Sequence, residues 1–169
     1  MTQRQVYLDH NSTTPLHPEV AKTLTEAMTV FGNPSSMHAF GRQAKGMVNE
    51  ARERVASFIG ALPEEVIFVG SGSEGNNTVL SILGCAATGC SCDRVHKPHI
   101  VTTAIEHPCI LETSKCLTGR GSKVTYLGVD EYGKIDLKEL RDSITEQTGV
   151  VSVMMANNET GVIQPLADV

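Results

Sequence analysis

The sequence predicts an α/β fold in which a mostly parallel sheet carries helices on both faces. After residue 60, short apolar segments alternate with segments of helical period, the order of strand–helix–strand units. The apolar segments are continuous runs rather than apolar–polar alternations, which indicates strands covered on both sides. With 169 residues and 40% hydrophobic content, the chain is long enough for one domain with a sizeable core.

Two helices are predicted in the first part of the chain. One spans residues 17–31, where apolar side chains recur at helical spacing and a proline suits the first turn. The other spans residues 40–59, and Gly60 is expected to end it. Between them, FGNPSSMHAFGR is rich in Gly, Pro, Asn and Ser, so it predicts an ordered loop.

The later elements are predicted in strict alternation, beginning with a strand. The strands are expected at residues 66–69 (VIFV), 99–103, 123–129 and 150–156, and the helices near 74–84, 108–118 and 135–144. We therefore divide the chain into an N-terminal segment with helices, residues 1–60, and an α/β part, residues 61–169. Together they are expected to form one incomplete domain.

Charge and composition exclude several classes of function. The net charge is −5 and the 14 basic residues are scattered, so the chain has no electrostatic footprint for nucleic acid or an anionic membrane. No run approaches the roughly 20 apolar residues of a membrane span, and the N-terminus lacks the apolar core of a secretory signal. A cytoplasmic location is expected, and a mitochondrial one stays open.

The cysteine-rich segment GCAATGCSC was considered as a metal site. Cys85, Cys90 and Cys92, followed by His96 and His99, offer thiolate and imidazole ligands of the kind that zinc prefers. The spacing contains no C-x-x-C pair. We therefore expect an ordinary loop with reduced thiols and no metal.

The turn GSGSEGNN follows the predicted strand at residues 66–69, and ligands of parallel sheets bind at the carboxyl ends of strands. Small residues let a ligand approach the backbone, and a helix beginning near Ser73 would aim free N–H groups at an anion. Gly72 and Ser73 are the candidate donors to a phosphate. Neither a P-loop nor a G-x-G-x-x-G motif is present. The alternative is a plain helix N-cap with Glu74 in the first turn.

Two further turns, IEHPC and NNETG, also follow predicted strands. His107 could act as an acid or base, or stack on a flat cofactor, and the alternative is a structural histidine. Asn157 and Asn158 could donate to a ligand oxygen, and the alternative is a turn amide that bonds its own backbone.

Taken together, the motifs resemble those of one family. They are YLDHNSTTP, FGNPSS, GRQAK, GSGSEGNN, IEHPCIL, YGKIDLKEL and MMANNETGVIQPL, and they cover essentially the whole chain. In this order, the motifs resemble those of the class V aminotransferase family, and within it those of the cysteine desulfurases and selenocysteine lyases that use pyridoxal 5′-phosphate (PLP). The resemblance implies the large domain of PLP-dependent transferases of fold type I, with residues 61–169 as its N-terminal part, and a homodimer.

The resemblance also implies roles for individual residues. Gly72 and Ser73 would hold the PLP phosphate, although the family usually has Thr where Ser73 stands. His107 would stack on the pyridine ring and assist proton transfer, and Asn158 would contact the ring hydroxyl.

The N-terminal segment, which in the family runs close to the substrate, supplies two further candidates. Asn11 and Thr13 lie in it and would contact the amino-acid substrate.

The implied reaction removes selenium or sulfur from L-selenocysteine or L-cysteine and gives L-alanine. We favour a selenocysteine lyase, because ANNETG and the insertion GCAATGCSCDRVH look more like that group. The alternative is a cysteine desulfurase that supplies sulfur for iron–sulfur clusters or thiolation. A protein that accepts the sulfur or selenium is an expected partner.

The family's Schiff-base lysine lies in a Ser-x-His-Lys context, and no lysine of this sequence does. The sequence is therefore interpreted as the N-terminal part of a longer enzyme, expected to be inactive alone. A non-catalytic chain that pairs with a full-length subunit is the alternative of another class.

Overall fold

The structure is a computed structural model that describes residues 5–83 and 98–169. It divides into two compact units, Met1–Phe68 and Val69–Val169, and each is described by itself. Within these residues, no helix is long and apolar enough to cross a membrane. Of the candidate metal ligands, Cys85, Cys90, Cys92 and His96 lie outside the described residues, and His99 lies within them.

The first unit contains helices α1 (Pro18–Ala27) and α2 (Ala39–Ile59) and the short 3₁₀ helix η1 (Pro63–Glu65). Both α-helices were predicted. Gly60 ends α2 with a left-handed φ of 70°, as expected of a glycine at a helix C-terminus.

The loop between α1 and α2 is ordered, as predicted. Asn33 stabilises it twice: its side-chain Oδ1 accepts from the Ser35 N–H at 2.8 Å, and its carbonyl accepts from the Ser36 N–H at 2.9 Å. Gly41 of α2 packs directly on this loop, because a Cβ at position 41 would lie 2.3 Å from the Ser36 carbonyl oxygen.

The strand predicted at residues 66–69 is wrong, because these residues form no strand. Their side chains are largely outside a core, and Ile67 is 81% exposed. A strand exists only where a neighbour completes its backbone hydrogen bonds. Among the described residues, the named strands pair only with one another, so VIFV has the composition of a strand without a partner. Arg52 of α2 holds this segment through its bond from Nε to the Val66 carbonyl, 3.2 Å long.

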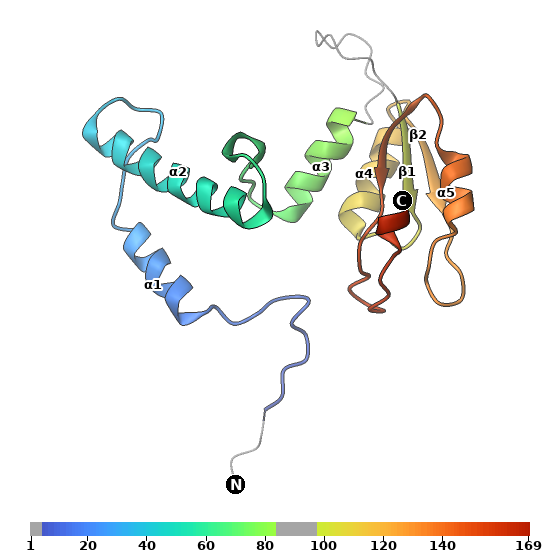
Figure 1. The fold of residues 1–169 in the computed structure, drawn as a ribbon, viewed down its shortest axis with the longest axis horizontal. Coiled ribbons are helices and arrows are strands. Elements are labelled where there is room, and N and C mark those ends of the chain that lie inside the picture. The colour runs from blue at the N-terminus through green and yellow to red at the C-terminus, as the bar shows by residue number, and fades with distance from the viewer. Residues whose placement is uncertain (1–4, 84–97) are drawn as a thin grey trace. The chain divides into compact units, whose positions relative to one another are not determined.

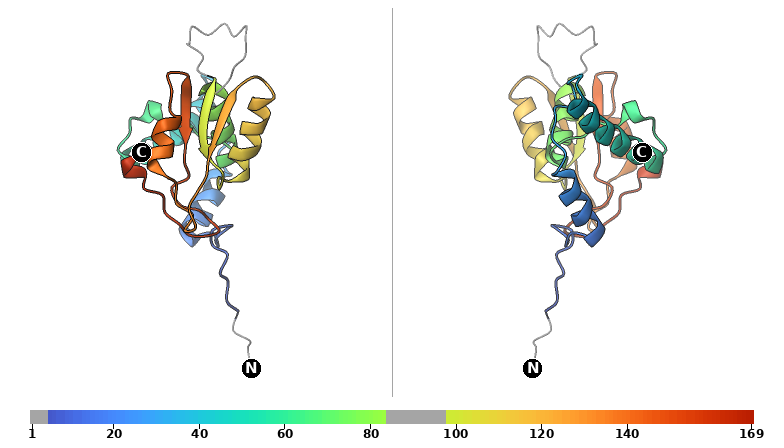
Figure 2. Two further views of the ribbon diagram at one scale, coloured as in Figure 1. Left: turned by 90° about the vertical axis from the view of Figure 1, so that its right-hand side faces the viewer. Right: turned by 90° about the vertical axis from the view of Figure 1, so that its left-hand side faces the viewer.

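The second unit contains the predicted parallel sheet, and the α/β fold class is confirmed. Strands β1 (His99–Thr103), β2 (Lys123–Leu127) and β3 (Thr148–Ser152) lie in the order β2-β1-β3 (Figure 2). Both pairings are parallel. The central strand β1 is buried along its whole length, as predicted, although His99, Thr102 and Thr103 are polar.

Helices cover the two faces of this sheet (Figure 1). Helices α3 (Gly72–Leu83) and α4 (Pro108–Thr118) pack on one face and α5 (Leu137–Ser143) on the other. Successive residues of β1 point to opposite faces: Ile100 belongs to the core under α3 and α4, and Val101 to the core under α5.

The third strand differs from its prediction of residues 150–156. It begins at Thr148 and ends at Ser152, because the chain then folds back on itself in a hairpin. Ala156 forms an antiparallel bridge with Ile163, and Gln164 N–H donates to the Met155 carbonyl at 2.9 Å. A short 3₁₀ helix, η2 (Leu166–Asp168), follows. The apolar run VVSVMMA therefore forms the end of a parallel strand and the first arm of a hairpin.

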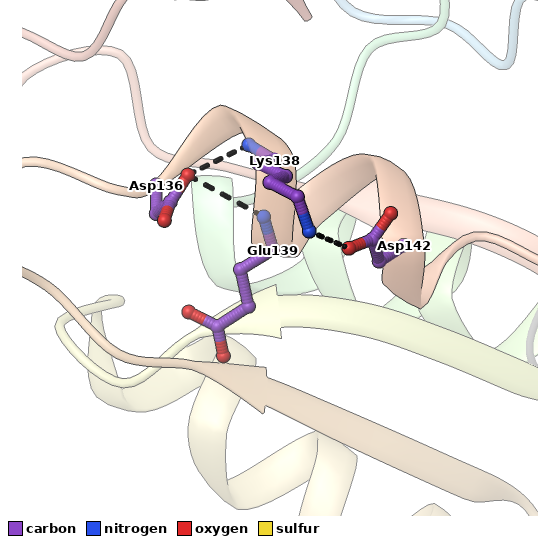
Figure 3. A network of polar contacts seen from close by, with 4 residues as sticks. All are labelled: Asp136, Lys138, Glu139 and Asp142. Carbon is purple, nitrogen blue, oxygen red and sulfur yellow. Dashed lines mark hydrogen bonds and ion pairs between the residues drawn. The ribbon is translucent and has the colours of Figure 1, made fainter.

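Helix α5 is fixed by its first residues (Figure 3). The Asp136 carboxylate accepts from the backbone N–H groups of Lys138, at 2.7 Å, and Glu139, at 3.4 Å. The exposed Lys138 ammonium then pairs with Asp142 at 2.7 Å. An N-cap of this kind satisfies N–H groups that have no partner within the helix.

Candidate functional site

His107 lies at the end of the turn between β1 and α4. Pro108 takes the first position of α4 and His107 is its N-cap, with imidazole Nδ1 accepting from the Cys109 N–H at 3.1 Å. This bond places a lone pair on Nδ1, so the proton of the neutral ring is on Nε2. The His107 side chain is exposed, and its orientation is set by the helix that it caps.

Asn157 and Asn158 lie in the hairpin that follows β3, in different environments. Asn157 is buried, and its Oδ1 accepts from the N–H groups of Glu159 and Thr160, both at 2.9 Å. The prediction of a turn amide is therefore right for Asn157. Asn158 is exposed, which leaves it as the residue of the pair that presents its side chain at the surface.

One hollow joins these two turns. It has a volume of about 470 Å³ and is lined by residues 104–108 of the turn after β1 and residues 157–160 of the hairpin. The fold therefore brings His107 and Asn158 together, although they are far apart in the sequence. Their meeting point is the carboxyl edge of the sheet, where ligands of α/β folds bind.

The first turn of α3 contains the two candidate phosphate donors. Ser71 Oγ accepts from the Glu74 N–H and the Ser71 carbonyl from the Gly75 N–H, both at 3.2 Å. The predicted N-cap is thus present, and Ser71 provides it. It leaves the N–H groups of Gly72 and Ser73 without a backbone acceptor among the described residues, as expected for the first positions of a helix. These free N–H groups are the ones that bind anions at helix N-termini.

Helices α3 and α4 begin at the same edge of the sheet. Asn76, one turn into α3, donates from Nδ2 to Cys109 Sγ at 3.2 Å, and Cys109 lies in the first turn of α4. Since Ser73 precedes Asn76 by three residues and His107 precedes Cys109 by two, the phosphate candidates and the imidazole belong to neighbouring helix N-termini.

Asn11 and Thr13 lie in the first unit. The chain turns there, because the N–H groups of Ser12 and Thr13 donate to the Asp9 carbonyl at 3.1 and 3.3 Å. Tyr7 Oη closes the turn by donating to the Thr13 carbonyl at 3.2 Å. A substrate contact by Asn11 or Thr13 stays a prediction.

Sequence reasoning missed Glu106, the residue before His107. Its side chain is buried, and Oε1 accepts from Thr103 Oγ1 at 3.1 Å and from the Met154 N–H at 2.6 Å. Burial raises the pKa of this carboxyl group, and the two hydrogen bonds partly oppose the rise. The signal in the sequence was a carboxylate in the short turn after a predicted strand, where a buried polar group needs partners.

Sequence reasoning also missed Gln164. It is buried, and its amide accepts from the Ile135 N–H at 3.0 Å and donates to the Gly133 carbonyl at 2.7 Å. It ties the hairpin after β3 to the turn before α5.

Comparison with known proteins places these features in a family. The model of the family described as aminotransferase class V matches residues 6–169. The chain is 42% identical to a cysteine desulfurase of Trichormus azollae and 44% identical to the cysteine desulfurase IscS of Rickettsia felis. Each match covers 97% of this chain, but only 40% and 39% of the relative.

Solved structures agree with the sequence relatives. A structure described as a NifS-like protein superposes with a TM-score of 0.83 at 36% identity, covering 98% of this chain and 44% of the other. The structure of SspA in complex with cysteine superposes with a TM-score of 0.82 at 32% identity, covering 96% and 45%. The chain thus spans less than half the length of the relatives that it matches.

Proposed function

Because the chain belongs to the class V aminotransferase family, whose members depend on PLP, we propose that it supplies the phosphate-binding and ring-binding part of a PLP site. The proposed reaction removes sulfur or selenium from L-cysteine or L-selenocysteine and leaves L-alanine. One observation carries this proposal: His107 and Asn158 line a single hollow at the carboxyl edge of the sheet. The first turn of α3, with the N–H groups of Gly72 and Ser73, begins at the same edge.

The donors present fit the cofactor. The N–H groups of Gly72 and Ser73, with the Ser73 hydroxyl, suit an anionic phosphate at a helix N-terminus. The exposed imidazole of His107 offers a flat face for a pyridine ring, and the Asn158 amide offers a donor or acceptor to its hydroxyl. PLP, when bound, withdraws electrons from the amino acid attached to it.

His107 is the proposed acid or base. Its Nδ1 accepts from the Cys109 N–H, so in the neutral ring Nε2 bears the proton and is the donor, and uptake of a second proton at Nδ1 would break the bond to Cys109. The helix cap fixes the ring, so the proton is exchanged at a constant position relative to the hollow.

The remaining catalytic groups are proposed to lie outside these 169 residues, since the chain spans about 40% of its curated relatives. They include the lysine that bonds the PLP aldehyde and an acidic partner of the pyridine nitrogen. Pairing with a second subunit is part of the same proposal.

Two observations bear on the substrate, and they favour different amino acids. The similar proteins are named cysteine desulfurases, which favours cysteine, whereas ANNETG and the segment GCAATGCSCDRVH favour selenocysteine. A longer protein that carries this sequence should be given each amino acid in turn, and L-alanine measured. Turnover of selenocysteine alone would support a lyase and turnover of cysteine a desulfurase. Alanine from neither would refute the proposed reaction.

A further inference from the structure

The turn after β1 and the hairpin after β3 are joined by two hydrogen bonds that run in opposite directions. From the turn, Glu106 Oε1 accepts from the Met154 N–H at 2.6 Å. From the hairpin, Asn157 Nδ2 donates to the Ile105 carbonyl at 3.1 Å. Both side chains are buried, where a hydrogen bond is shielded from competition with water.

Each of these two side chains directly precedes a predicted cofactor residue. Glu106 precedes His107 and Asn157 precedes Asn158. All four residues line the hollow. In each pair, the buried side chain bonds to the opposite loop and the side chain beside it is exposed. A shift between the two loops would therefore change the separation of His107 and Asn158 directly.

We propose that Glu106 and Asn157 form a polar clamp that sets the spacing between His107 and Asn158 across the bound cofactor ring. They act as positioning residues, through the hydrogen bonds that join the two loops. The proposal rests on the proposed function, because the spacing matters only if a planar ligand lies in the hollow.

Glu106 and Asn157 also form hydrogen bonds within their own parts of the chain. Asn157 Oδ1 accepts within its own turn from Glu159 and Thr160, and Glu106 Oε1 also accepts from Thr103 of the preceding strand. Each of these two residues is therefore held by hydrogen bonds within its own part of the chain as well as by its bond to the opposite loop. The bonds to Met154 and Ile105 are the ones that connect the two loops.

Substitutions can separate the bridging bonds from the local ones. Asn157→Asp keeps the Oδ1 acceptor of the turn and removes the donor to Ile105, and Glu106→Ala removes the acceptor of the Met154 N–H. Glu106→Gln keeps an acceptor oxygen and removes the charge, so it should restore most of what Glu106→Ala loses. Glu131→Ala removes an exposed carboxylate from another turn and serves as the matched control.

The first measurement is hydrogen exchange of the Met154 amide in the 169-residue chain without PLP. The amide should be protected in the wild type and in Glu131→Ala, and should exchange about tenfold faster in Glu106→Ala, since the bond to a charged acceptor is lost. Protection that is unchanged in Glu106→Ala would overturn the clamp.

The second measurement is PLP binding by equilibrium dialysis, with the free energy of unfolding measured on the same variants. Asn157→Asp and Glu106→Ala should weaken PLP binding about fivefold or more, the value of one hydrogen bond. Glu106→Gln and Glu131→Ala should bind nearly as the wild type does. If the unfolding free energy falls while PLP binding is unchanged, the residues are merely structural and the inference fails.

The two proposals fail in different ways. A wild-type chain with a protected Met154 amide that takes up no PLP would refute the proposed function and, with it, the role of the clamp in cofactor binding. PLP uptake that is indifferent to Asn157→Asp and Glu106→Ala would refute the inference alone.

Discussion

Asn157 donates a hydrogen bond to the Ile105 carbonyl over 3.1 Å, across a separation of 52 residues in the sequence. The bond links the ends of β1 and β3, which are neighbours in the sheet. Because each strand is followed by a polar turn at the same edge, side chains from distant parts of the chain converge there. This convergence, rather than any single motif, makes the edge a candidate site.

Ser71 and Ser73 should have separable effects in the first turn of α3. Ser73→Ala is expected to weaken PLP binding about tenfold, the value of a hydrogen bond to a charged group, and to leave stability unchanged. Ser71→Ala should lower the free energy of unfolding by about 1 kcal/mol, because it removes the N-cap bond to Glu74. Dialysis against PLP and urea unfolding of both variants measure the two effects. Equal loss of PLP binding in the two variants would contradict the assignment.

Gly41 should tolerate no side chain. A Cβ there would lie 2.3 Å from the Ser36 carbonyl oxygen and 2.7 Å from that of Asn33, so Gly41→Ala is expected to destabilise the first unit by about 1–3 kcal/mol. Gly46 lies in the same helix with nothing within 4 Å of its Cβ position. Gly46→Ala should instead stabilise α2 by about 0.5–1 kcal/mol. Thermal unfolding followed by circular dichroism distinguishes them, and similar midpoints for both variants would argue against the packing of the loop on α2.

Asp136 should matter more to α5 than Asp142, although both are exposed aspartates near Lys138 (Figure 3). Asp136→Ala removes the bonds to two backbone N–H groups and should cost about 1 kcal/mol. Asp142→Ala breaks only an exposed ion pair and should cost about 0–0.5 kcal/mol. The free energy of unfolding in urea is the measurement. A larger loss for Asp142→Ala would show that the ion pair, not the cap, stabilises the helix.

His99 should make stability depend on pH. Its ring bridges strands at 2.8 Å to Thr148 and 2.9 Å to Thr125, and burial, with a smaller contribution from Lys123, lowers its pKa in the folded protein. As pH falls below the ordinary histidine pKa of about 6.5, the unfolded chain binds the proton first, so stability is lost in acid and retained above it.

The test compares unfolding free energies at about pH 8 and about pH 5 in the wild type and two variants. His99→Gln should reduce the loss of stability in acid, even if it is less stable throughout. Gln43→Ala alters an exposed side chain that has no titratable group and should leave the pH dependence as it is in the wild type. A wild-type chain with the same pH dependence as His99→Gln would contradict the role given to His99.

The sequence predicted the elements that depend on local pattern and burial. β1 was predicted at its observed bounds because its Ile, Val and Thr residues are typical of a strand, and α2 because Gly60 gives a clear C-terminal signal. Residues 66–69 show the limit of such patterns. Their composition is that of a strand, but strand formation depends on a partner, and composition does not supply one.

The candidate site was predicted in part for a related reason. His107, Asn157 and Asn158 were predicted from residue type and from their place after strands, and the family resemblance selected Asn158 from the pair. Glu106 and Asn157 act through bonds between loops that are distant in sequence, and such bonds follow from the strand order rather than from any local motif. In the sequence, these bonds are indicated only by two adjacent polar pairs, Glu106 with His107 and Asn157 with Asn158.

The most direct test of the central claim, that this chain provides the phosphate and ring contacts of a PLP site, is equilibrium dialysis of the 169-residue chain against PLP, beside His107→Ala. We expect the wild type to take up PLP, inorganic phosphate to compete with it, and His107→Ala to take up markedly less. No uptake by the wild type, or equal uptake by His107→Ala, would contradict the claim.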